Sequence, residues 1–269
     1  FDWDNYWALE YTSGPNVDLK YVDQIHQYYR YFYDRNIPVN MIPFDADFSR
    51  YKMVVAPVLY MVKAGMQEAL EEFVKNGGVL VTTYMSGIVD QSDNVYLGGY
   101  PGVLSKMAGV WVEEIDALAP EQENTVIFED GDSAPGRLVC DIIHLRGAKC
   151  IGRYGQDFYE ESPAVTKNRF GNGSVYYMGT QMDKEGIAKV LDMAAEDVSV
   201  KPVIEEKTGL EITCRRKDGY RYYFVMNFKD EDLEIPSCFA GNTDLLTRES
   251  VKSGEMLSKF DVKIIRTEE

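Results

Sequence analysis

Histidine and cysteine, which often carry nucleophilic and metal chemistry, are scarce in this 269-residue chain. The two histidines, His26 and His144, lie in no serine-nucleophile motif. The four cysteines are widely spaced and form no CxxC pair: Cys140, Cys150, Cys214 and Cys238. Zinc-ligand spacing is therefore absent, and a disulfide framework is not expected in a chain of this size. We expect free thiols in a reducing compartment, which predicts a cytoplasmic location.

Positive charge and long apolar runs are also lacking. The chain has 28 Lys and Arg against 44 Asp and Glu, with a net charge of −16. Such a surface cannot neutralise a line of phosphates, so we expect no nucleic-acid partner. No apolar run approaches the roughly 20 residues that span a bilayer, so we expect no membrane partner. With 45% hydrophobic residues, the composition is that of an ordinary globular protein.

Phosphate-binding and nucleophile motifs are missing as well. The absence of GxGxxG and GxxxxGK[ST] leaves no cradle for a dinucleotide or a nucleoside triphosphate, and there is no G-x-S-x-G elbow. The close carboxylates, Asp45 with Asp47 and Glu113 with Glu114, are typical of solvated or loop-capping residues. We therefore assign no catalytic, cofactor-binding or metal-binding residue to this chain, and we expect no cofactor.

What the sequence does contain is a helix–strand–turn unit at residues 74–87. Gly77 or Gly78 can end the helix in the left-handed backbone region without a Cβ clash. Residues 79–83, Val-Leu-Val-Thr-Thr, form the short apolar run of a strand covered on both faces. The loop after such a strand is where α/β proteins usually place ligands and catalytic groups. Residues 83–87 are therefore the candidate site.

Helix and strand patterns alternate over the first 200 residues. We predict a strand within 1–11, a helix at 19–35 with Asp18 as its N-cap, strands at 39–42 and 51–59, and a helix at 64–75. Beyond the candidate site we predict a short helix at 104–108, a strand at 110–115, an acidic loop at 117–136, strands at 138–143, 148–154, 163–170 and 174–178, and a helix at 184–195. This order predicts a wound, flavodoxin-like α/β sheet.

The helix predicted at 19–35 is aromatic beyond one stripe. Its core-facing residues step by three and four: Val22, Ile25, Tyr29 and Phe32. Tyr21, Tyr28 and Tyr31 fall on other faces. They fit either tyrosine packing at a domain edge or a subunit contact, where tyrosine is enriched.

From residue 201 the hydrophobic pattern changes to period two. Leu210, Ile212 and Cys214 alternate with polar residues, and Asp218-Gly219 supplies a hairpin turn before a return strand at 220–226. Further strands are predicted at 233–235, 243–246 and 262–265. The sequence therefore predicts two domains, an α/β domain at 1–200 and a small antiparallel β domain at 201–269.

The turn at 83–87 resembles the catalytic elbow of class I glutamine amidotransferase-like domains. Those domains place a cysteine there, where a helix dipole and a base make the thiol nucleophilic. Here Tyr84, Met85 and Ser86 occupy the turn. Met85 cannot form a thiolate, and Ser86 has no identifiable base. We predict an amidotransferase-like scaffold without its chemistry.

Several motifs in one order resemble the family 42 glycoside hydrolases, the bacterial β-galactosidases. They are FDWDNYWALE (1–10), YKMVVAP (51–57), FVKNGGVLV (73–81), GGYPG (98–102), VWVEEID (110–116), TCRRKDG (213–219) and FVMN (224–227). The resemblance covers essentially the whole chain, and an ordered set of motifs is more specific than any one of them.

The resemblance implies a division of labour. Such enzymes have an N-terminal (β/α)8 barrel with two catalytic glutamates, an amidotransferase-like domain that forms a homotrimer, and a small β domain. This chain resembles only the second and third parts, so no glutamate here inherits a catalytic role. We expect a fragment of a retaining β-galactosidase that acts in oligomer assembly and meets galactoside only through the barrel. The start at Phe1, without methionine, fits that expectation.

Two alternatives belong to other functional classes. One is a self-contained amidotransferase-like hydrolase that uses Ser86 as its nucleophile. The other is a carbohydrate-binding module with Trp3, Trp7 or Trp111 as a stacking platform, although tryptophans more often serve core or interdomain packing.

Overall fold

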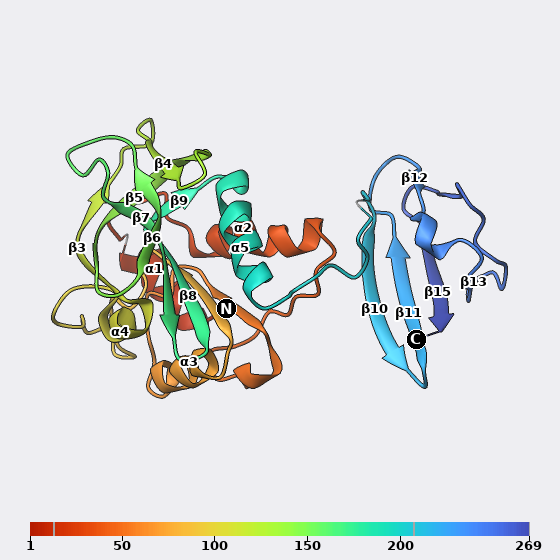
Figure 1. Ribbon diagram of the computed structural model, residues 1–269, viewed down its shortest axis with the longest axis horizontal. Helices are drawn as coiled ribbons and strands as arrows, with labels where there is room; N and C mark the ends of the chain where they lie inside the picture. Colours follow the sequence, from red (N-terminus) through yellow and green to blue (C-terminus); the bar gives the residue numbers. More distant parts are fainter. Residues whose placement is uncertain (13, 207, 269) are drawn as a thin grey trace. The chain divides into compact units, whose positions relative to one another are not determined.

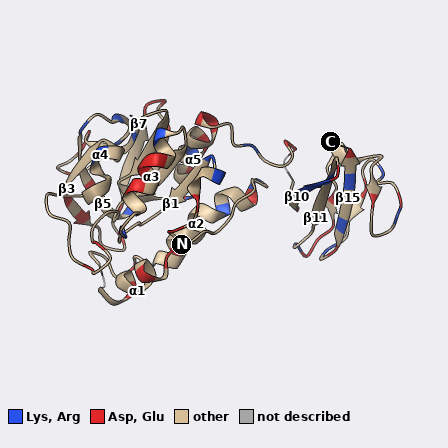
Figure 2. Ribbon diagram, turned by 90° about the horizontal axis from the view of Figure 1, so that it is seen from below, with Lys and Arg blue, Asp and Glu red and all other residues tan. Residues whose placement is uncertain are grey.

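The computed structural model describes residues 1–12, 14–206 and 208–268. The chain forms two compact units (Figure 1). The first contains Phe1–Tyr28 and Met41–Val200, and the second contains Tyr29–Asn40 and the chain from Lys201 onward. The second unit thus includes residues 29–40, which the sequence-based division assigns to the first domain. Acidic residues are scattered over both units, with no single acidic tract (Figure 2).

The first unit is built on a nine-stranded mixed sheet in the order β1-β2-β8-β7-β6-β4-β5-β3, with β9 paired to β5. Only β1, β2 and β8 run parallel. The strands are β1 (Met53–Ala56), β2 (Val79–Thr83), β3 (Val110–Ala117), β4 (Asn124–Phe128), β5 (Ser133–Leu145), β6 (Lys149–Tyr154), β7 (Pro163–Phe170), β8 (Gly173–Met178) and β9 (Thr180–Met182). The predicted α/β class is therefore confirmed, but the sheet is parallel only at the β1 end and antiparallel in the remainder.

The helices of this unit are α1 (Trp3–Thr12), α3 (Met66–Lys75), α4 (Ser105–Ala108) and α5 (Lys184–Asp197), with 3-10 turns at Phe48–Arg50 and Gly102–Leu104. Helices α3 and α5 both pack against β2 and β8. All five residues of β2 are buried, as a strand covered on both faces requires. Gly77 has φ +106 and ends α3 in the left-handed region, as predicted.

Three local predictions are wrong. Residues 3–12 are helical because Asp2 acts as an N-cap, its side chain accepting from the Asp4 N–H at 3.3 Å. Residues 39–42 form no strand. The acidic stretch 117–136 is not all loop, because it contains β4 and the start of β5, which pair with each other.

Helix α2 (Tyr21–Asp34) confirms the predicted helix and corrects its details. Asp18 is not its N-cap, since the Asp18 N–H donates to Asn16 Oδ1 and the helix begins at Tyr21. The three tyrosines assigned to other faces are buried: Tyr21, Tyr28 and Tyr31. Their wide apolar rings fill the core beside the expected stripe, so within this chain they serve packing.

The second unit has a four-stranded antiparallel sheet in the order β10-β11-β15-β13 and a separate pair, β12 with β14. The strands are β10 (Glu211–Lys217), β11 (Tyr220–Met226), β12 (Leu233–Glu234), β13 (Thr243–Asp244), β14 (Met256–Leu257) and β15 (Val262–Glu268), with a 3-10 turn at Ser237–Phe239. The Asp218-Gly219 turn has positive φ at both residues, 53° and 77°, as a two-residue hairpin needs. The predicted hairpin is confirmed.

Candidate functional site

The turn after β2 has the sharp shape expected of an elbow. Met85 lies in the left-handed region at φ 56°, which is unusual for a residue with a side chain. The Tyr84 N–H donates to Met178 O at 2.7 Å, and the Gly87 N–H donates to Leu59 O at 2.8 Å. At Gly87 a Cβ would lie 2.0 Å from Pro101 O, so only glycine fits. The turn is held on three sides by backbone.

Ser86, the one candidate nucleophile, is buried with none of its surface exposed. Its hydroxyl accepts from the Leu59 N–H at 3.0 Å and lies 2.9 Å from Thr82 Oγ1. Neither histidine is among its partners: His144 Nε2 lies 2.7 Å from Glu113 Oε2, and His26 is exposed on α2. Ser86 therefore has neither a base nor solvent access, and its hydroxyl joins two loops.

A buried carboxyl, Asp141 of β5, is a second polar feature of the core that was not singled out from the sequence. The Tyr177 hydroxyl donates to Asp141 Oδ2 at 2.6 Å, and Oδ1 has no hydrogen-bond partner among the described residues. Burial raises the pKa of Asp141 to about 8, although the hydrogen bond from Tyr177 opposes the shift. The only sequence signal is an aspartate inside the apolar run 139–143.

Two buried tyrosine hydroxyls near this carboxyl are hydrogen-bonded within the core. Tyr84 donates to Gln24 Oε1 at 2.6 Å, and Tyr154 donates to Gly179 O at 3.1 Å. The adjacent thiol of Cys140 lies 3.6 Å from Thr180 Oγ1, and burial raises its pKa to about 11. A thiol held protonated in this way is a poor nucleophile. The cluster is therefore part of the buried polar core.

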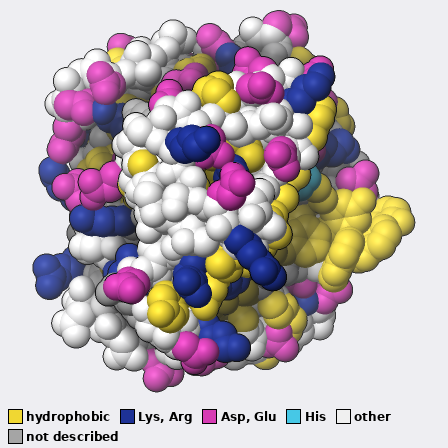
Figure 3. Space-filling model, turned by 90° about the vertical axis from the view of Figure 1, so that its right-hand side faces the viewer, with side chains coloured by type: hydrophobic (Ala, Val, Ile, Leu, Met, Phe, Trp, Pro, Cys, Tyr) yellow, Lys and Arg dark blue, Asp and Glu magenta, His cyan; other side chains and the backbone are white. Residues whose placement is uncertain are grey.

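The three tryptophans lie in two different places, on helix α1 and on strand β3. Trp3 and Trp7 lie on α1 with Tyr11, which stacks on Trp7 at 5.7 Å between ring centroids. These side chains are 63%, 48% and 77% exposed, respectively. We call Trp3, Trp7 and Tyr11 the aromatic row. Figure 3 shows hydrophobic side chains gathered in a cluster that projects from the surface. Trp111 lies on β3, where its Nε1–H donates to Gly98 O at 2.9 Å.

Helix α1 holds the aromatic row rigidly on the first unit. The Asn5 side chain accepts from the Met61 N–H at 2.7 Å and donates to Asp2 Oδ2 at 2.7 Å. Lys63 pairs with Asp2 at 2.7 Å. Since the polar side of α1 is fixed in this way, its aromatic side faces outward as a preformed surface.

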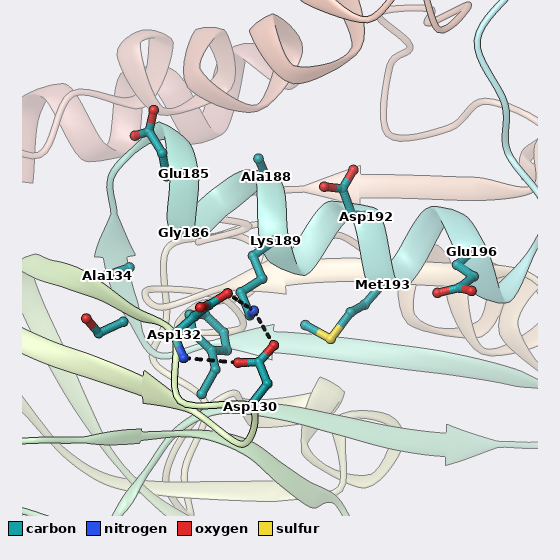
Figure 4. A pocket seen from close by; sticks show the side chains of 12 residues that line it. Asp130, Asp132, Ala134, Glu185, Gly186, Ala188, Lys189, Asp192, Met193 and Glu196 are labelled. Carbon is teal, nitrogen blue, oxygen red and sulfur yellow. Dashed lines mark hydrogen bonds and ion pairs between the residues drawn. The ribbon is translucent and has the colours of Figure 1, made fainter. Parts of the chain in front are cut away.

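A hollow of the first unit, about 590 Å³, lies between α5 and the turn that joins β4 to β5. Figure 4 shows Lys189 reaching from α5 toward Asp130 and Asp132 of that turn. The Lys189 ammonium lies 2.6 Å from Asp132 Oδ2, and its hydrogen bond holds the pKa of Asp130 below its ordinary value. The positive charge in this hollow is therefore already paired with carboxylates of the protein itself. No cluster of three or more metal-ligating side chains occurs among the described residues.

By its fold, the chain is a mixed α/β domain followed by a small antiparallel β domain. The elbow-shaped turn of the first domain has no accessible nucleophile. The comparisons with known proteins add the family. Residues 1–201 match the family 42 glycoside hydrolase domain described as the beta-galactosidase trimerisation domain, and residues 209–267 match the beta-galactosidase C-terminal domain. The chain belongs to glycoside hydrolase family 42, as its motifs predict.

Individual relatives of this chain are members of the same family. The chain is 45% identical over 267 residues to beta-galactosidase LacA of Lactobacillus acidophilus, covering 99% of this chain and 40% of the relative. It is 41% identical over 270 residues to BgaA of a Planococcus species, covering 98% of this chain and again 40% of the relative. The chain thus spans about 40% of the length of these curated relatives.

Solved structures show the same relationship. The beta-galactosidase of Bacillus circulans sp. alkalophilus superimposes with a TM-score of 0.93 at 40% identity, over 99% of this chain and 40% of that one. The E323A catalytic mutant of Gan42B from G. stearothermophilus gives 0.93 at 36% identity, over 100% and 40%. No helix among the described residues is long and apolar enough to cross a bilayer.

Proposed function

We propose that this chain is the assembly portion of a retaining β-galactosidase that hydrolyses terminal β-D-galactosides on an N-terminal barrel. The observation that carries the proposal is the match of nearly the whole chain to two family domains, neither described as catalytic, at about 40% of the relatives' length. Residues 1–200 form the trimerisation domain and residues 201–269 the C-terminal domain. Neither supplies a catalytic, cofactor-binding or metal-binding residue.

The amidotransferase-like origin of the first domain is part of the same proposal. The parallel strands β1, β2 and β8 and the left-handed Met85 at the end of β2 support it. The buried Ser86 gives the hydrolase alternative no support. The four free cysteines, two of them buried, fit the cytoplasmic location that the sequence predicts.

The oligomer is a homotrimer formed through the first domain. The aromatic row on α1 is a rigid exposed surface of the kind that association covers, because large aromatic side chains are enriched at interfaces. The family description of this domain supports the trimer.

Activity and mass measurements on the purified chain test this function. The chain alone is expected to release no nitrophenol from a nitrophenyl β-galactoside, while the complete polypeptide does. Light scattering of the chain is expected to give three times the 30.6 kDa chain mass. Turnover by the chain alone would overturn the proposed division of labour, and a monomer at every concentration would overturn the trimer.

A further inference from the structure

Two side-chain oxygens in the core of the first unit have no hydrogen-bond partner among the described residues. They are Asp141 Oδ1 on β5 and Thr166 Oγ1 on β7. Asp141 is 1% exposed and Thr166 is 0% exposed, so neither oxygen reaches bulk solvent. Native proteins pair nearly all such buried polar atoms, either with protein groups or with internal water, because an unpaired one lowers stability. Each oxygen therefore needs a partner that the described side chains do not supply.

The two oxygens belong to residues that both adjoin Tyr177 on β8. Thr166 lies directly opposite Tyr177 in the antiparallel pairing of β7 with β8, so the two side chains leave the sheet on the same face. The Tyr177 hydroxyl donates to Asp141 Oδ2 at 2.6 Å. Gly179 also links the backbones of β5 and β7, since it accepts from the Asp141 N–H and donates to Ala164 O, each at 2.8 Å. Side chains of β5 and β7 therefore meet around the Tyr177 ring.

The protonation state of Asp141 defines the chemistry of the missing partner. Burial raises the pKa of Asp141 to about 8, so the carboxyl is uncharged at neutral pH. Since Oδ2 accepts from Tyr177, we place the carboxyl proton on Oδ1, which then needs an acceptor. The Thr166 hydroxyl can donate or accept. The partner must therefore be uncharged and able both to accept and to donate hydrogen bonds, as water is.

The neighbouring tyrosine hydroxyls already have acceptors of their own. Tyr84 donates to Gln24 Oε1 at 2.6 Å, and Tyr154 donates to Gly179 O at 3.1 Å. Their protons are therefore not available to Asp141 Oδ1 or to Thr166 Oγ1. The two unpaired oxygens are left as the polar atoms that a bound molecule would join.

We propose that the core of the first unit binds one internal water molecule, which bridges Asp141 Oδ1 on β5 and Thr166 Oγ1 on β7. The molecule accepts the Asp141 proton and forms a second hydrogen bond with the Thr166 hydroxyl. It joins two strands that are not neighbours in the sheet order, and so adds a polar link across the core. The inference is independent of the proposed function, because it concerns the folding of this chain alone.

Crystal structures of the chain and of two Thr166 variants test the site directly. In the wild type, electron density for one water within hydrogen-bonding distance of both oxygens is expected. Thr166→Ser keeps the hydroxyl and should keep the water, whereas Thr166→Val should lose it. Absence of density between the oxygens in the wild type, or a direct hydrogen bond between them, would overturn the proposal. Unchanged density in Thr166→Val would also overturn it, because Thr166 would then not hold the water.

The sign of a stability change provides an independent readout. Thr166→Val replaces the hydroxyl by a methyl group of the same shape, and we expect it to lower the urea midpoint by roughly 0.3–0.5 M, because the bridge is lost. A hydroxyl without any partner would give the opposite sign, since its removal relieves a buried unpaired group. A raised midpoint would therefore overturn the proposal. Thr180→Val is the matched control and should lower the midpoint, because that hydroxyl donates to Arg137 O at 3.2 Å.

A monovalent cation is the competing occupant of the same place. The uncharged Asp141 carboxyl favours water, so the urea midpoint is expected to be the same in sodium, potassium and choline chloride at one ionic strength. A midpoint that depends on which cation is present, and loses that dependence in Thr166→Val, would show that an ion occupies the site and would overturn the proposal.

Discussion

The hydroxyl of Tyr177 on β8 donates to the carboxyl of Asp141 on β5 at 2.6 Å, in a part of the core where Asp141 is 1% exposed. The Asp141 N–H also donates to Gly179 O at 2.8 Å. Strand β5 is thus tied to the end of β8, although β7, β6 and β4 lie between them in the sheet order. Burial of the Asp141 carboxyl makes the stability of the first unit depend on pH.

The sign of that dependence follows from the raised pKa. The folded protein keeps the Asp141 proton up to a pKa of about 8, whereas the ordinary value is 3.8. Between these values the folded state binds more protons than the unfolded state, so the free energy of unfolding falls as pH rises, by at most about 1.4 kcal/mol per pH unit from this group. The contribution is fully present below about pH 4. The nearby tyrosines Tyr84 and Tyr154 stay neutral, because burial raises their pKa values well above the ordinary value.

Asp141→Asn is therefore expected to flatten the pH dependence of unfolding between the two values, because an amide does not ionise and still accepts from Tyr177. Urea unfolding followed across that pH range measures the effect. Glu160→Gln, at an exposed position, is the control and should leave the wild-type slope unchanged. A variant with the wild-type slope would show that Asp141 does not titrate in the core.

Ser86→Ala is expected to lower the free energy of unfolding by about 1–3 kcal/mol, because it leaves the buried Leu59 N–H without an acceptor. Galactoside hydrolysis by the complete polypeptide should be unchanged per folded molecule. Denaturant titration measures the loss of stability, and a nitrophenyl galactoside assay measures hydrolysis. Ser92→Ala, at an exposed serine of the same unit, controls for loss of a hydroxyl. Loss of hydrolysis without loss of stability would revive the serine hydrolase reading.

Trp3→Ser combined with Tyr11→Ser is expected to weaken self-association of the chain, because it removes the two most exposed rings of the aromatic row. Sedimentation velocity over a concentration series measures the shift toward monomer. Leu97→Ser, at a side chain that is 96% exposed, is the matched control and should leave association unchanged. An unaltered trimer in the double variant would place the contact elsewhere on the first unit.

The same aromatic row distinguishes assembly from carbohydrate binding. Calorimetry of the chain with galactose or lactose is expected to give no heat of binding, because small-molecule sites enclose most of their ligand, whereas the rings of the row are exposed on α1. Saturable heat that disappears in the Trp3 and Tyr11 variant would establish a carbohydrate-binding surface instead.

Asn36 is the key polar residue of the second unit. It lies in the left-handed region at φ 53°, accepts from the Ile212 N–H at 2.8 Å and donates to Leu210 O at 3.1 Å. Asn36→Ala is expected to cost about 2–4 kcal/mol, from lost hydrogen bonds and a strained backbone. Asn36→Gly loses the same bonds without the strain, so it should cost about 1 kcal/mol less. Denaturant unfolding measures both, and equal losses would show that the backbone is not strained.

Local chemistry explains which parts of the fold the sequence could predict. The glycine break and apolar run at β2, the Asp218-Gly219 hairpin and helices α3 and α5 depend on residues close together in sequence, and all agree with prediction. Helix α1 was missed because its aromatic residues favour a strand, whereas Asp2 and Asn5 start and anchor the helix through partners that include Met61. The mixed sheet was missed because the pairing of β4 with β5 and β6 is visible only in three dimensions.

At the candidate site, too, some features follow from the sequence and others only from the tertiary structure. By itself, the sequence determined the family, since ordered motifs survive without knowledge of contacts, and it determined that the turn at 83–87 has no cysteine. Only the tertiary structure decided that Ser86 is sealed from solvent and that Asp141 is buried with one oxygen unpaired among the described residues. Burial and strand pairing are set by residues far apart in the chain, so they appear only when the chain has folded.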